Sequence, residues 1–121
     1  MGWQVTNRST AGAAAAATVS APATSAGNIQ VTRLRALQCR VAGTGAGQDL
    51  LTVKDGSTVI ANFDVSIAAN GSDQVTISDL DLRASPGNDL VIAFASGIAN
   101  ARENVNAQGD YVPQGYPMFE N

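Results

Sequence analysis

The chain has 121 residues, a formal net charge of −3 and a charged fraction of only 14%. Its length fits one domain with a core of its own. The absence of histidine removes the usual general base near neutral pH and the commonest transition-metal ligand. A mildly negative chain is also a poor match for nucleic acid or anionic membranes. We therefore expect no enzyme activity, no cofactor, no nucleic-acid partner and no membrane partner.

Cys39 is the only cysteine, so an intrachain disulfide is excluded. It lies in an alternating apolar segment, and no histidine is available to activate it. We expect a small buried hydrophobe. Aromatic residues make up only 5% of the chain, which predicts a thin, aliphatic core.

Residues 1–14 are polar and small, with Trp3 as the large apolar side chain. They are predicted to form an N-terminal arm, which either folds back along its own domain or lies on another chain. Residues 15–20 favour a short strand and a helical turn about equally.

Residues 29–41 carry β-branched residues at both ends, and their alternation changes phase in the middle. A strand with a bulge near Arg33 explains this, because the bulge would turn Leu34 and Ala36 inward. A helix with Leu34, Leu37 and Val41 on one stripe is the alternative. The strand is favoured, since the glycine-rich loop 43–47 follows it. That loop lacks the lysine and the helix of a phosphate-binding loop.

Residues 50–67 predict a β-hairpin. The residues Lys54-Asp55-Gly56 suit a three-residue loop in which Gly56 adopts a positive φ. This loop pairs Val53 with Ser57 and Leu51 with Val59. The side chains of one face would then point inward: Leu51, Val53, Val59, Ala61, Phe63, Val65 and Ile67.

The remaining strands are shorter. Residues 73–83 alternate with a phase change that predicts a bulge at Ser78-Asp79, and residues 90–94 form the next inward series. Residues 98–107 predict a last strand with Val105 inside and Arg102, Asn104 and Asn106 outside. The proline-containing tail from 109 to 121 is expected to be extended and not to join a central strand.

Short strands at spacings of about ten residues, with turn signals between them, predict an antiparallel β-sandwich. Its connections are either jelly-roll or immunoglobulin-like. The predicted division is an N-terminal arm (1–14), a sandwich domain (15–108) and a C-terminal tail (109–121).

Candidate chemical sites are weak. Two carboxylates two residues apart, with a third nearby, suggest calcium ligands: Asp79, Asp81 and Asp89. Asp64 and Glu103 form a conceivable glycosidase pair, but no aromatic sugar platform accompanies them. The strand arginines are expected to point outward, where they blunt sheet edges or contact a partner: Arg33, Arg35, Arg40, Arg83 and Arg102.

Large aromatic side chains gather in the terminal segments of a chain that has few of them. Anchoring on a neighbouring subunit is a natural use for such residues, and plugging the ends of their own sandwich is the alternative. The predicted capsid or subunit interface residues are Trp3, Arg8, Tyr111, Tyr116 and Phe119.

Three motifs carry a family resemblance: LTVKDGSTVI, ISDLDLRASPGNDLVIAFASG and NARENVNAQGDYV. They resemble parts of small β-sandwich proteins encoded among the structural genes of tailed bacteriophages, over roughly residues 28–112. The resemblance implies a virion structural protein, best matched by a capsid decoration (cement) protein on the outer capsid surface. Its implied partners are the major capsid protein and other copies of the chain, with a trimer as the expected oligomer. The alternative is a host-receptor or glycan-binding module that uses exposed loops such as 43–47 and 86–88.

Overall fold

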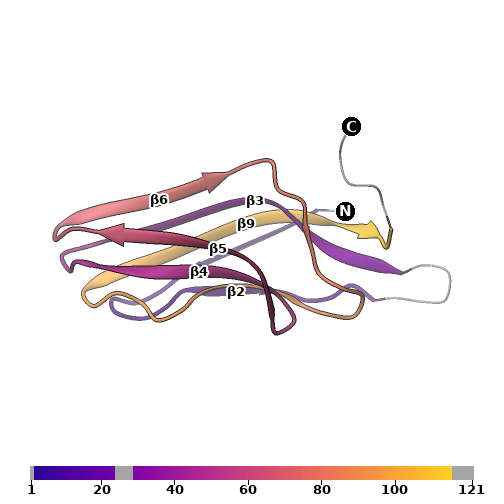
Figure 1. Ribbon diagram of the computed structural model, residues 1–121, viewed down its shortest axis with the longest axis horizontal. Coiled ribbons are helices and arrows are strands. Elements are labelled where there is room, and N and C mark those ends of the chain that lie inside the picture. Colours follow the sequence, from indigo (N-terminus) through magenta and orange to yellow (C-terminus); the bar gives the residue numbers. More distant parts are fainter. Residues whose placement is uncertain (1, 24–28, 116–121) are drawn as a thin grey trace.

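The computed structural model describes residues 2–23 and 29–115, which form two packed antiparallel sheets whose strands run along the long axis of the molecule (Figure 1). Sheet 1 has the order β1-β9-β3-β6, with the short β7 also paired to β3, and sheet 2 has the order β2-β8-β4-β5. The strand bounds are Gly2–Arg8 (β1), Ala16–Val19 (β2), Gln30–Gly43 (β3), Gly47–Asp55 (β4), Thr58–Ile67 (β5), Gly71–Ile77 (β6), Leu82–Arg83 (β7), Leu90–Phe94 (β8) and Ala101–Pro113 (β9). In these described residues, no helix is long and apolar enough to span a bilayer.

The connectivity is that of a jelly roll. Consecutive strands alternate between the sheets, except within the β4–β5 hairpin and at the step from β6 to β7. With the two-residue β7 set aside, the other eight strands form two sets of four, and their crossings match the jelly-roll arrangement. The predicted all-β sandwich is confirmed, and its connections are not immunoglobulin-like.

The core lies between the two sheets and is aliphatic, as predicted. Sheet 1 contributes Leu34, Leu37, Cys39, Val41 and Val105, all at most 1% exposed. Sheet 2 faces them with Leu51, Val53, Val65, Leu90 and Ile92, which are equally buried. The alternation of buried and exposed residues along much of the strands follows from the two-residue period of the pleat.

The β4–β5 hairpin forms, and Gly56 has the expected positive φ of 62°. The predicted register is wrong. Asp55 pairs with Thr58 and Val53 pairs with Ala61, so a two-residue turn closes the hairpin and Ile60 is an extra, bulged residue. The bulge restores the inward phase for the rest of β5 while leaving Val59 48% exposed.

The strand prediction for residues 29–41 is confirmed by β3, whose register shifts between Leu34 and Ala36. Leu34 is fully buried, as expected. Ala36 was predicted to face inward, and this is wrong: Ala36 pairs with the exposed Gln108 on the outer side of sheet 1. The bulged residue is Arg35, so the alternation of inward and outward side chains shifts two residues after the position predicted, near Arg33.

The bulge at Arg35 also explains why the predicted strand 73–83 is broken in two. β6 ends at Ile77, and the backbone N–H of Leu80 then donates to the carbonyl of Arg35 at 3.0 Å. The chain steps around the bulge and pairs again as β7, opposite Arg33 and Leu34.

Both terminal segments belong to sheet 1. β1 pairs with β9 from Gly2↔Asp110 to Arg8↔Asn104, so the described part of the N-terminal arm folds onto its own domain. The predicted exclusion of the tail from a central strand is wrong for residues 109–113, since β9 lies between β1 and β3 and continues to Pro113. Proline is tolerated there because it ends the strand.

Gly109 is required by the close approach of two neighbours. A Cβ atom at this position would collide with the backbone oxygen of Arg33 and lie 2.6 Å from Cζ2 of Trp3. We expect Gly109→Ala to lower the free energy of unfolding by about 2 kcal/mol, because backbone and indole must both shift. Gly2→Ala is the matched control, since its Cβ would meet only an ordinary contact at 3.4 Å. Urea denaturation of both variants measures the difference, and equal stabilities would contradict the packing argument.

Candidate functional site

The outer side of sheet 1 is covered by uncharged polar side chains and arginines. These residues, which we call the polar face, occupy the positions that alternate with the core residues. They are Gln4, Thr6 and Arg8 on β1, Arg102, Asn104, Asn106 and Gln108 on β9, Gln38 and Arg40 on β3, and Ser72, Gln74 and Thr76 on β6. None of them is a carboxylate.

The strand registers arrange the polar face in rows across the sheet. One row runs Thr6, Asn106, Gln38 and Thr76, and a second row runs Arg8, Asn104, Arg40 and Gln74. Few of these groups bond to each other: Oδ1 of Asn106 accepts from Gln4 and Thr6, and Gln74 donates to Thr76. The amide groups of Gln38, Asn104 and Gln108 take no part in these bonds. Two of the arginines that were predicted to point outward, Arg40 and Arg102, are exposed on this face.

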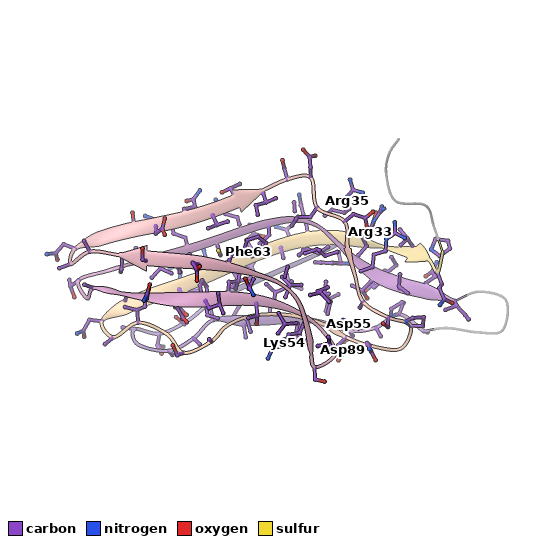
Figure 2. All side chains as sticks on the ribbon, in the orientation of Figure 1. Arg33, Arg35, Lys54, Asp55, Phe63 and Asp89 are labelled. Carbon is purple, nitrogen blue, oxygen red and sulfur yellow. The ribbon has the colours of Figure 1, made fainter. Side chains whose placement is uncertain are left out.

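Arg33 lies toward the opposite end of sheet 1. It was expected to be an exposed, outward-pointing arginine, and this prediction is wrong. Arg33 is only 7% exposed. Its Nε and Nη2 each donate to the carboxylate of Asp110 at 2.8 Å, and its Nη1 lies 3.9 Å from Oδ2 of Asp81. Figure 2 shows Arg33 and Arg35 close together at this end of the molecule.

Asp81, one of the three candidate calcium ligands, is committed to arginines. Arg83 binds both of its oxygens, at 2.8 and 3.0 Å. The hydrogen bonds from Arg83 hold the pKa of Asp81 below its usual range, and Arg33 holds down that of Asp110 in the same way. At this end of sheet 1, beyond the polar face, the two aspartates and their arginines form a network of ion pairs.

The other calcium candidates are not brought together with Asp81. Asp79 is exposed, and Oδ1 of Asp89 accepts from the backbone N–H of Ala21 at 2.8 Å. Within residues 2–23 and 29–115, no group of three or more possible metal ligands is assembled.

A buried carboxyl pair joins the two sheets, and sequence reasoning missed it. Glu103 on β9 is fully buried and Asp49 on β4 is 6% exposed. Asp49 accepts hydrogen bonds from the backbone N–H groups of Leu50, Ser96 and Gly97 at 2.8, 3.1 and 2.7 Å. Oε1 of Glu103 accepts from the N–H of Ala15 at 3.3 Å.

The opposite pKa shifts of the two carboxyls indicate that they share one proton. Burial and the neighbouring Asp49 raise the pKa of Glu103 to about 8. Burial alone would also raise the pKa of Asp49, but hydrogen bonds from Glu103 and from the backbone outweigh it and lower that pKa. These directions favour a protonated Glu103 beside an ionised Asp49, and no described residue donates to Oε2 of Glu103.

The glycosidase pair considered from sequence does not form. Asp64 is an exposed residue of β5 in sheet 2, whereas Glu103 is buried in the interior beside Asp49. The carboxyl pair that does form fastens β4, β9 and the segment around Ala15, and its oxygens face the interior rather than a cleft.

Internal contacts anchor the two loops proposed for ligand binding at single points, while residues 86–88 are exposed. At the β4–β5 tip, Asp55 accepts from Ser85 and Asn88 at 2.7 to 2.9 Å, and Gly56 N–H donates to the carbonyl of Asp89. Figure 2 shows Lys54, Asp55 and Asp89 together at this tip. In loop 43–47, a Cβ on Gly45 would collide with the backbone of Ala99, so its glycine serves close packing.

The predicted interface residues divide into three groups. Trp3 and Tyr111 are half-buried and pack against the core of their own sandwich, and Trp3 Nε1 donates to the carbonyl of Asp110 at 3.1 Å. Arg8 is exposed on the polar face. Tyr116 and Phe119 lie outside the described residues. Contact with a partner stays a prediction for this set.

Cys39 is buried, as predicted, and burial raises the pKa of its thiol to about 11. A thiol held in its neutral form inside the core is not a nucleophile at neutral pH.

No protein-family model and no curated protein matches the chain. Similar solved structures include a carbohydrate-binding module, CBM36, in complex with calcium and xylotriose (TM-score 0.41, 13% identity, 87% of this chain and 78% of that one). They also include the Tobacco streak virus coat protein (TM-score 0.37, 9% identity, 99% and 92% covered). A third is the C-terminal CBM6 of LamC from Zobellia galactanivorans (TM-score 0.40, 14% identity, 83% and 74% covered). The structural neighbours thus include a viral coat protein and carbohydrate-binding modules, at similarities too low to assign this chain a ligand or a partner.

Proposed function

We propose that the chain is a non-enzymatic structural protein of a tailed-phage virion, a decoration (cement) protein that binds the outer capsid surface. The observation that carries this proposal is the polar face, a broad sheet surface with unbonded amide groups and no carboxylate. The major capsid protein is its partner. The N-terminal segment takes part through the outward side chains of β1, which is built into the sheet.

The physical basis of stabilisation is mass action. A protein that binds the assembled shell and not its separated subunits raises the free energy of disassembly. Amide and hydroxyl groups form the wet, hydrogen-bonded contacts that are common at protein surfaces, and symmetry repeats each weak contact over the shell. Contacts between copies, with a trimer as the first expectation, would add to this effect.

The glycan-binding alternative lacks an aromatic platform in the described part of the chain. Phe94 is buried, and Trp3, Phe63 and Tyr111 are half-buried and packed against the core. Stacking on a sugar needs an open ring face, and amide groups alone give little affinity in water. The decoration role is therefore the better match.

The direct test adds purified protein to undecorated capsids. We expect saturable binding at a stoichiometry related to the capsid symmetry, and a higher disruption temperature of the decorated shell. Sedimentation measures the first and thermal scanning the second. Absence of capsid binding, combined with binding on a glycan array, would replace the decoration role by the adhesion role.

A charge placed at the centre of the polar face should weaken capsid binding. Gln38→Glu adds a carboxylate in the middle row without changing the shape of the side chain. We expect about a tenfold loss of affinity, because an unpaired charge must lose water at the contact. Asn62→Glu on β5 is the matched control, since it adds the same charge at an exposed position of sheet 2. Equal losses for both variants would show that the polar face is not the contact surface.

A further inference from the structure

The arginine end of the polar face surrounds a hollow. Arg8 and Arg40 lie opposite Asn104 on either side of β9, and Arg102 precedes Asn104 by two residues on the same strand. Because neighbouring strands are about 4.8 Å apart, the backbones of Arg8 and Arg40 are roughly 10 Å apart. These four residues line a hollow of about 180 Å³, together with Ala42 and Glu103.

The positive charges of this hollow are not neutralised within the described chain. In residues 2–23 and 29–115, Arg8, Arg40 and Arg102 have no carboxylate within ion-pair distance, in contrast to Arg33 and Arg83 at the other end of the sheet. Three like charges so close together repel each other in the free protein. Bound carboxylates would relieve that repulsion and give each guanidinium an acceptor.

Asn104 supplies a second, independent feature. Its Oδ1 atom is buried at the hollow and has no hydrogen-bond partner. The oxygen and nitrogen of an amide exchange places by a half-turn, so the same side chain can present its NH₂ group to an anion. The Glu103 carboxyl points to the other side of the sheet, toward Ala15 and Asp49, and leaves the hollow positive.

We propose that this basic hollow, formed by Arg8, Arg40, Arg102 and Asn104, binds carboxylate side chains of an acidic protein segment. The identity of the partner rests on the proposed function, under which the segment belongs to the capsid subunit. Nucleic acid fits less well, because binding it requires an extended track of phosphate contacts and this chain carries a net charge of −3. The neighbouring amides of the polar face provide hydrogen bonds to the backbone of the bound segment.

The test uses the full chain and needs no capsid. A hexaglutamate peptide is titrated into ¹⁵N-labelled protein, and the Nε–Hε signals of the three arginines report the site. We expect saturable shifts at these signals, weakened by added salt. Arg40→Gln should lower the peptide affinity about fivefold and the triple glutamine variant about a hundredfold. Lys54→Gln on β4 removes the same single charge from the other sheet and should leave the affinity unchanged.

Several outcomes would overturn the proposal. These are an absence of arginine shifts, an equal loss in Lys54→Gln and Arg40→Gln, or displacement of the peptide by inorganic phosphate at matched ionic strength and equal anion concentration. The last outcome would show a general site for small anions. The decoration role can fail on its own. In that case the protein would bind the peptide through the three arginines and would not sediment with capsids.

Discussion

Replacing Glu103 by glutamine should remove the pH dependence of stability that this carboxyl contributes, so that the order of stability of the two proteins reverses between acid and alkaline pH. At pH 5 we expect the natural protein to be more stable than Glu103→Gln by about 1 kcal/mol, because the neutral acid is the better donor to ionised Asp49. At pH 9 we expect Glu103→Gln to be the more stable protein by about 2 kcal/mol. Glutamine keeps the shape and a donor group without acquiring a charge.

The direction in which stability changes with pH follows from the linkage between proton binding and folding. The pKa of Glu103 rises from its ordinary value of 4.5 to about 8 in the folded protein. Between these two values the folded state holds a proton that the unfolded state has released, so stability falls as the pH rises. The contribution of Glu103 is complete below pH 4.5 and is lost above pH 8. An ionised Glu103 would face ionised Asp49 in the interior, and no described residue donates to its Oε2 atom.

Urea denaturation at pH 5, 7 and 9 measures this difference. Asp64→Asn is the matched control, since it neutralises an exposed carboxylate and should give a curve parallel to that of the natural protein. Parallel curves for Glu103→Gln as well would mean that Glu103 is ionised in the folded state at neutral pH, and would refute the shared proton. Hydrogen exchange at pH 9 should locate the loosening around Ala15 and Gly97, whose N–H groups donate to the pair.

Much of the sandwich could be predicted from alternation alone, and the errors have a common cause. The inward series of β3, β8 and β9 were visible because side chains on a strand alternate faces. A bulge shows in the sequence as a change of phase, but the residue that is extruded depends on the partner strand. This is why the bulge was expected near Arg33 and lies at Arg35, and why Ile60 was not foreseen.

For the buried charged residues, too, the sequence indicates which side of the sheet a residue lies on but not which residue it contacts. Alternation with Val105 places Glu103 on the inner face, so a signal for a buried acid was present in the sequence. Its partner Asp49 comes from the other sheet, and only the jelly-roll connectivity brings the two together. The outward side of Arg33 could likewise be predicted, whereas its burial depends on Asp81 and Asp110, which the step to β7 and the extension of β9 place beside it.

Removing the carboxylate of Asp110 should destabilise the end of sheet 1 at which it binds Arg33. Arg33 is nearly buried, and both of its charge-assisted bonds to Asp110 measure 2.8 Å. We expect Asp110→Asn to lower the free energy of unfolding by about 2 to 3 kcal/mol. The cost comes from leaving a buried guanidinium with weaker acceptors, and partial exposure of Asp110 keeps it below the range for fully buried pairs.

A double-mutant cycle separates this effect from a general loss of packing. Arg33→Met removes the buried charge and keeps an unbranched side chain, so adding Asp110→Asn to it should cost well under 1 kcal/mol. Additive losses would show that Asp110 acts independently of Arg33. In acid, the natural protein should lose the same contribution as the pH falls through the lowered pKa of Asp110, since the ion pair is complete only above the carboxyl's ordinary range. The Asp110→Asn variant lacks that group, so its stability should depend less steeply on acid pH, and an unchanged slope would place the acid-sensitive group elsewhere.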